Sequence, residues 1–188
     1  MRPRYSTEAI VLARSPLAEA SALLYLLTHE FGLVKARAQG VRKPGAKLAP
    51  AVQTLYECDT ILVRGKDGWR LGGAVLGKNW FSTLTPSARS RAGRIARLLL
   101  RLMHGESNDG APFYIFRGFL EALPLLTEAE AEAAECLAAL RLLRALGLDA
   151  GDIAGEEHEY TKETLAPIIG DRRSYIMRVN RGIDASGL

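Results

Sequence analysis

The sequence predicts an α+β protein in which a five-stranded β-barrel comes first and a helical domain follows. Through about residue 76, apolar residues tend to alternate with polar ones in short runs separated by turn residues, as in half-buried strands. From Pro86 onward they recur every three or four residues instead, which is the period of an amphipathic helix. We therefore expect a barrel domain over residues 1–80 and a helical domain over residues 81–188.

Five strands are expected, at residues 5–14, 21–29, 33–39, 51–64 and 69–76. The second also suits a helix, but the turn at residues 30–32 favours a hairpin into the third strand. Lys66-Asp67-Gly68 predicts a hairpin turn because Asp-Gly readily adopts positive φ, and Gly72-Gly73 predicts a bulge or bend where the sheet closes. Five strands in about 75 residues fit a small closed barrel, of which the OB-fold is the commonest five-stranded version.

Three helices are expected after the barrel. The first starts at Pro86, and the second covers residues 113–126 and is bent or ended near Pro124, because proline lacks a donor for the helix. The third has Thr127 as its N-cap, Glu130 in the capping-box position and Gly147 as its C-cap. Residues 149–163 are polar and acidic and predict a loop, and residues 164–188 predict one last helix.

Composition narrows the class of protein. The chain is 48% hydrophobic and 24% charged, as globular proteins are, and no apolar run approaches the roughly 18 residues of a membrane span. We therefore expect a cytoplasmic protein. Residues 1–80 hold 12 Lys/Arg against 6 Asp/Glu, whereas residues 81–188 hold 13 against 15. A basic front half joined to a mildly acidic back half indicates two parts with different tasks.

The residues that carry catalysis or metal binding form no recognisable pattern. Two cysteines and three histidines are dispersed, so no spacing suits a metal site, and the cysteines are expected to be reduced core residues. Phosphate-cradling loops, dinucleotide fingerprints and nucleophile–base spacings are not seen in the sequence. We expect a protein that is not an enzyme and needs no cofactor.

Residues 31–47 carry the clearest functional signal. Lys35, Arg37 and Gln39 fall on one side of the expected strand, and a loop with Arg42, Lys43 and Lys47 follows, with no acidic residue in between. A basic strand face leading into a basic loop suits an extended polyanion better than a small-molecule pocket. The alternative is a solvated edge strand whose cations serve solubility.

A second basic group lies on the first expected helix. Arg94, Arg97 and Arg101 share one face, and this stripe is open to three interpretations: an extension of a DNA track, a receptor for an acidic peptide, or a solvated helix face. The aromatic residues Tyr56, Trp69 and Trp80 are candidates for stacking on bases, but they are expected to lie in the core.

The N-terminal half resembles the bacterial recombination mediator RecO. The resemblance extends over about the first 80 residues, and the expected helices follow in the right order and size but without a sharp motif. The matching residues are Thr7-Glu8-Ala9-Ile10-Val11-Leu12, Glu19, Leu23-Leu24, Thr28, Gly32-Leu33-Val34, Gly40-Val41-Arg42-Lys43, Lys47-Leu48 and Gln53.

The resemblance implies an OB-fold followed by a helical domain. It also implies binding of single- and double-stranded DNA, annealing of complementary strands, and work with RecR to load RecA onto strands coated by single-stranded-DNA-binding protein. The family recognises the hydrophobic, acidic C-terminal tail of that coating protein. Many members carry a four-cysteine zinc module after the third helix. Residues 149–163, without cysteine, resemble a shortened, metal-free replacement, which puts partner contacts of that region in doubt.

Overall fold

The computed structural model describes residues 3–18 and 20–187, so Glu19 lies outside the described residues. The chain forms two compact units. One contains the residues up to Thr83 together with Met103–Phe113, and the other contains Leu84–Leu102 and the chain from Tyr114 onward. No helix in the described part of the chain is long and apolar enough to cross a membrane.

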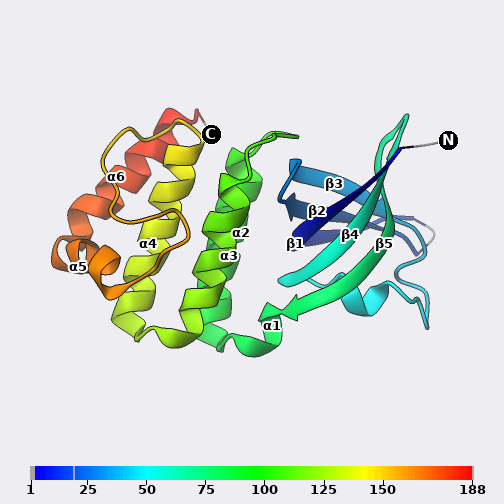
Figure 1. Cartoon of the computed structure of the whole chain (residues 1–188), viewed down its shortest axis with the longest axis horizontal. Helices are drawn as coiled ribbons and strands as arrows, with labels where there is room; N and C mark the ends of the chain where they lie inside the picture. The colour runs from blue at the N-terminus through cyan, green and yellow to red at the C-terminus, as the bar shows by residue number, and fades with distance from the viewer. Residues whose placement is uncertain (1–2, 19, 188) are drawn as a thin grey trace. The chain divides into compact units, whose positions relative to one another are not determined.

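The first unit is the predicted five-stranded OB-fold barrel. It closes in the order β1-β2-β3-β5-β4, and all neighbouring strands are antiparallel except β3 and β5 (Figure 1). The strands are β1 (Arg4–Pro16), β2 (Ala22–Thr28), β3 (Gly32–Ala38), β4 (Tyr56–Gly65) and β5 (Gly68–Asn79).

Irregular positions in the long strands curve the barrel. Gly72 is the extra residue of a bulge, because Ile61 pairs with Gly73 while Leu62 pairs with Leu71, and this confirms the bend expected there. The hairpin between β4 and β5 differs in detail from the expectation. Its two turn residues are Lys66 and Asp67, and the positive φ of +99° falls on Gly68, which already pairs with Gly65.

The prediction of a strand over residues 51–64 is wrong at its start. Residues Ala49–Ala51 form the 3-10 helix η1, and β4 begins only at Tyr56. Two features stop an extended strand here. Leu55 has a φ of +62°, outside the extended region, and the side-chain amide of Gln53 donates to the carbonyl of Ala49 at 2.6 Å, which folds the chain back on itself.

The segment Met103–Phe113 packs on the turn between β2 and β3. Glu106 forms an isolated bridge with Gly32, and the Ser107 N–H donates to the Phe31 carbonyl at 3.1 Å. Gly32 has a φ of +62°, and a Cβ atom there would meet the Ser107 nitrogen at 3.0 Å. Only glycine permits this close approach of the two backbones.

The second unit consists of packed helices. α4 contacts α2, α5 and α6, and Figure 1 labels these helices in its green to red part. The chain's helices are the short α1 (Trp80–Thr83), α2 (Pro86–Leu102), α3 (Ala111–Ala122), η2 (Leu123–Leu125), α4 (Glu128–Ala145), α5 (Lys162–Gly170) and α6 (Arg172–Ala185).

The N-terminal capping residues of α4 agree with the sequence. Thr127 and Glu130 form the expected capping box, in which the Thr127 N–H donates to the Glu130 carboxylate at 2.9 Å. At the other end the C-cap is Leu146, one residue before the predicted Gly147, which follows it with a φ of +73°. The expected single C-terminal helix is wrong: α5 ends at Gly170, and Asp171 (φ −137°, ψ 57°) leaves the helical region and caps α6 by accepting from Ser174. Leu188 lies outside the described residues.

A buried arginine holds the loop between α4 and α5. Arg141 is 3% exposed, and its guanidinium donates to the carbonyls of Ala154, Glu157 and Glu159 at 2.9, 3.1 and 2.6 Å. It also lies 4.9 Å from the ring centroid of Tyr160. One side chain thus satisfies three carbonyls of a loop that has no regular structure of its own.

We expect Arg141→Met to destabilise the protein by about 2–4 kcal/mol, because it keeps the apolar stem and removes every donor to the three carbonyls. Urea unfolding followed by circular dichroism measures the effect. Arg144→Met, an exposed position on the same helix, is the matched control and should change stability by less than about 0.5 kcal/mol. Equal losses in the two variants would contradict the role of Arg141.

The start of the same loop is held by an ion pair that predicts a dependence on pH. Hydrogen bonds from Arg178 keep the pKa of Asp149 below its ordinary value, although burial opposes this shift. A carboxylate with a depressed pKa in the folded state stabilises the fold above its unfolded pKa, and this contribution is lost as pH falls through the folded pKa. Asp149→Asn should therefore lower stability at pH 7 and reduce the loss of stability below about pH 4. Parallel pH profiles of the variant and the wild type would contradict this.

Candidate nucleic-acid interface

The outer face of β3 carries the predicted basic row. Lys35 and Arg37 are exposed, whereas Val34, Ala36 and Ala38 between and beside them are buried at 1%, 0% and 0% exposure. The alternation follows from the pleat, because the apolar set fills the barrel and the intervening side chains must point outward. On β2, Tyr25 lies opposite Lys35, and its ring centroid is 5.7 Å from the Lys35 ammonium.

The loop after β3 presents the other predicted cations. Val41 is buried at 2% exposure and anchors the loop, while Arg42, Lys43 and Lys47 are exposed. The backbone N–H of Arg42 donates to the Ala20 carbonyl at 2.9 Å, and its guanidinium donates to the Leu17 carbonyl at 3.2 Å. Arg42 is therefore held in place, while the remaining guanidinium donors stay available.

Arg70 on β5 joins this group, and sequence reasoning missed it. It pairs with Arg37 across the parallel contact of β3 and β5, so both side chains lie on the outer face. The Arg70 guanidinium donates to the Gln39 side-chain oxygen at 2.7 Å. The signal that finds Arg70 is the strand order of a closed barrel, which brings β5 beside β3. The residues around Arg70 alone do not indicate it.

These six cations have no acidic partner in the part of the chain that the structure describes: Lys35, Arg37, Arg42, Lys43, Lys47 and Arg70. Elsewhere in the barrel, Arg64 pairs with Glu106 and lies 4.7 Å from the ring centroid of Trp69. Burial would raise the pKa of Glu106, but hydrogen bonds from Arg64 and Trp69 lower it. Cations left without carboxylates attract an anion from solution, which the paired Arg64 does not.

Of the three aromatic candidates, all expected to lie in the core, Trp69 and Trp80 are core residues and Tyr56 is not. Trp69 and Trp80 are 6% and 1% exposed, and their indole N–H groups donate to Glu106 and Glu57, each at 2.9 Å. Tyr56 is half-buried, and its hydroxyl accepts from the Asn79 amide at 3.0 Å. The two indoles are thus satisfied at their polar edges and have no face open for stacking.

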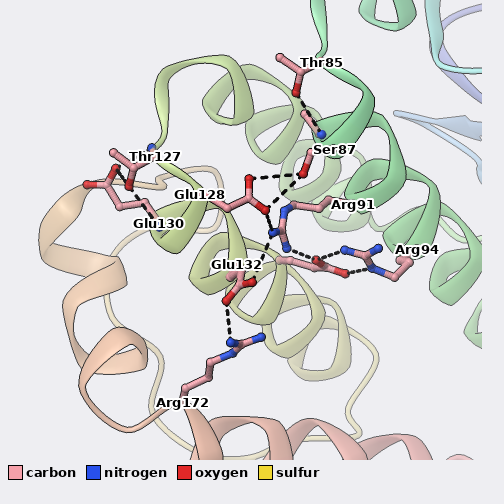
Figure 2. Close-up of polar contacts among 11 residues, drawn as sticks. Thr85, Ser87, Arg91, Arg94, Thr127, Glu128, Glu130, Glu132 and Arg172 are labelled. Carbon is pink, nitrogen blue, oxygen red and sulfur yellow. Dashed lines mark hydrogen bonds and ion pairs between the residues drawn. The ribbon is translucent and has the colours of Figure 1, made fainter.

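A cross-brace of ion pairs joins three helices of the second unit, and Figure 2 shows it. Arg91 on α2 is 7% exposed and contacts three carboxylates of α4 spaced by four and three residues: Glu128, Glu132 and Glu135. Arg172 on α6 contacts Glu132 at 2.6 Å. The sequence analysis did not single out these acids, although their spacing places them along one face of α4.

Beside this cross-brace lies a groove of about 500 Å³ within the helical unit. Its wall residues come from α2, α4 and α6 and combine apolar side chains with arginines and glutamates. Ile176, at 40% exposure, is a large apolar side chain left open to solvent there. The groove is lined by Arg91, Arg94, Ile95, Leu98, Glu132, Glu135, Cys136, Ala139, Arg172, Ile176, Val179 and Ile183.

The three arginines of the predicted α2 stripe have different surroundings. Arg94 lines the groove, where its guanidinium grips both carboxylate oxygens of Glu135, one of them at 2.7 Å. The hydrogen bond to Glu135 raises the pKa of Arg94 further above its ordinary value. Arg97 and Arg101 are exposed and do not line the groove. The stripe is therefore not a uniform free basic surface.

Nothing in the described residues suggests a metal centre, since they contain no group of three or more His, Cys, Asp or Glu side chains that could hold an ion. The two cysteines are free thiols, and burial raises the pKa of Cys58 to about 12 and that of Cys136 to about 11. Neither thiol is activated as a nucleophile.

By architecture, this chain is an OB-fold protein with a helical second unit and an uncompensated basic outer face on its barrel. Residues 1–71 match the family described as "Recombination protein O N terminal". Relatives named "DNA repair protein RecO" align with it. The protein of Heliobacterium modesticaldum is 33% identical over 144 residues, which are 76% of this chain and 51% of the relative. That of Dehalococcoides mccartyi strain 195 is 30% identical over 129 residues, or 67% of this chain and 50% of the relative.

A further relative of the same name, from Synechococcus elongatus, is 38% identical over 98 residues, which are 52% of this chain and 34% of the relative. The chain belongs to the RecO family. It spans about half or less of the length of these relatives.

Proposed function

We propose that this chain acts in DNA repair as a recombination mediator that binds single- and double-stranded DNA on the outer face of its barrel. The observation that carries the proposal is the group of six exposed or half-exposed cations on β3, β5 and the loop after β3, none paired with a carboxylate among the described residues. Lys and Arg near phosphates release condensed counterions, so this binding is strong at low salt and largely indifferent to sequence.

The same chemistry supports strand annealing. Two single strands repel each other through their phosphates, and a basic surface that neutralises part of this charge lets complementary bases approach. The family name of the relatives supports a role in repair. The proposal includes a RecR-like partner and help in loading recombinase onto strands coated by single-stranded-DNA-binding protein. In this proposal the protein acts by binding and not by catalysis. Its place of action is the cytoplasm, at the nucleoid.

Fluorescence anisotropy of a labelled single-stranded oligonucleotide, titrated over a salt series, tests DNA binding. Contacts from all six cations give a slope of log K against log salt on the order of −4, at about 0.7 per single-strand contact. The double variant Arg42→Glu/Lys43→Glu should weaken binding at least tenfold and make the slope shallower by about 1.4. Annealing of complementary oligonucleotides should slow with it.

The control for this variant is Arg173→Glu/Arg181→Glu, which makes the same change of net charge at two exposed positions of α6. It should bind DNA like the wild type. Unchanged affinity in the loop variant, with the fold intact by circular dichroism, would exclude the loop from the interface. Absence of binding by the wild type even at low salt would exclude the DNA-binding function itself.

A second candidate function is that of a protein-interaction adaptor, and the groove in the helical unit favours it. A groove lined by apolar side chains and arginines is complementary to a peptide that is both hydrophobic and acidic, such as the tail of single-stranded-DNA-binding protein. In this interpretation Arg94 and Arg172 meet the peptide's carboxylates, Arg97 and Arg101 extend the positive field, and the basic barrel face serves acidic protein surfaces with little direct DNA binding.

The variant Ile176→Asp tests this groove. Ile176 is 40% exposed and lines the groove, so an aspartate there should be tolerated by the fold while it repels an acidic peptide by charge and polarity. We expect at least a tenfold loss of affinity for an acidic, apolar tail peptide, measured by calorimetry. Met177→Asp is the matched control, because Met177 is the next residue, is 52% exposed and does not line the groove. Equal peptide affinities for the two variants would contradict the assignment.

A further inference from the structure

The barrel closes through one short contact. β3 and β5 pair through two residue pairs, whereas each of the other four strand neighbours pairs through seven or ten. One of the two pairs, Ala36 with Trp69, points inward and is buried. The other, Arg37 with Arg70, points outward. The seam of the barrel therefore consists of one apolar contact inside and two like charges outside.

The surroundings of these arginines provide no compensating charge. In the row that crosses the sheet, Leu23 on β2 lies opposite Arg37, and Val63 on β4 lies opposite Arg70. Both neighbours are aliphatic and offer no charge to the guanidinium groups. Neighbouring strands lie roughly 4.8 Å apart, and like charges directly opposite each other are destabilising. Among the described residues, no carboxylate pairs with either guanidinium group.

One neutral contact orients this pair. The side-chain oxygen of Gln39 accepts from the Arg70 guanidinium at 2.7 Å, which directs Arg70 toward the end of β3. The remaining donors of Arg70 and all those of Arg37 are available to an anion. A tetrahedral phosphate group can accept hydrogen bonds from two guanidinium groups at once. No carboxylate among the described residues takes this position between Arg37 and Arg70.

We propose that Arg37 and Arg70 form a phosphate clamp across the barrel seam, and that a bound phosphodiester holds the barrel closed. The proposal rests on the DNA-binding function and deepens it by naming the point at which the nucleic-acid backbone is gripped. Without an anion the two arginines repel each other across the shortest strand contact. With a phosphate between them, both become ligands of one group and join β3 to β5. Binding and barrel stability are then coupled, because a ligand that binds the closed barrel stabilises it.

The experiment measures thermal unfolding in a low-salt buffer free of phosphate and sulfate, for wild type, Arg37→Gln, Arg70→Gln and the double variant. Arg37 has no hydrogen-bonding partner among the described residues, so Arg37→Gln removes the repulsion and little else. We expect its Tm to rise by about 1–3 °C. The double variant should gain no more than the single ones, because either substitution removes the same repulsion. Arg173→Gln, exposed on α6, is the control for net charge and should leave Tm unchanged.

The ligand arms use a single-stranded oligonucleotide and inorganic pyrophosphate. Both should raise the Tm of the wild type, and the gain should fall by at least half in Arg37→Gln and Arg70→Gln but not in Arg173→Gln. For the oligonucleotide, each clamp variant should also reduce the salt slope by about 0.7. If pyrophosphate but not the oligonucleotide raises the Tm of the wild type, and the clamp variants lose this gain, the clamp is supported and the proposed DNA binding fails. A Tm that falls in Arg37→Gln, or ligand gains equal to those of Arg173→Gln, would overturn the clamp even if DNA binds.

Discussion

Closure of the barrel is the constraint on which the rest of the first unit depends. Once five strands enclose one core, every second side chain is committed to the interior, and Val34, Ala36 and Ala38 occupy it on β3. The side chains between them lose any role in packing and can be cationic without cost to the core. The basic face is thus a consequence of the same alternation that builds the barrel, and its cations are held at the spacing of a pleated sheet.

In the helical unit, arginine has a different task. Arg91 and Arg141 are buried, and each is surrounded by oxygen atoms, of three carboxylates in one case and three carbonyls in the other. Burying a guanidinium is costly unless it meets acceptors, and the terminal nitrogens of both side chains do so while the Nε atoms do not, so each arginine fixes the segments that supply its acceptors. Arg141 in this way orders residues 149–161, a stretch without regular structure and without cysteine.

Much of the fold follows from local signals that the sequence contains. The alternation of β3, the capping box of Thr127 and the bulge at Gly72 each depend on a few neighbouring residues. Where the predicted secondary structure is wrong, the conformation of the backbone or a contact with a distant segment overrides the local sequence pattern. Residues 51–55 have strand-like composition but contain the positive φ of Leu55, and the apolar period of the C-terminal segment continues across the break at Asp171. Arg70 and the glutamates facing Arg91 depend on pairings between distant segments, which no window of sequence reveals.

The contrast between paired and unpaired cations is what separates the two candidate functions. At the groove, Arg94 and Arg172 already bind glutamates, so an acidic peptide must exchange one carboxylate for another and gains mainly from the apolar side chains. On the barrel, the proposed phosphate has no carboxylate to displace, because Arg42 and Arg70 donate only to neutral oxygens, so its electrostatic gain is kept and varies with salt. The two proposed ligands, a hydrophobic acidic peptide and a nucleic-acid backbone, therefore depend on different dominant interactions, and the two proposals are compatible within one chain.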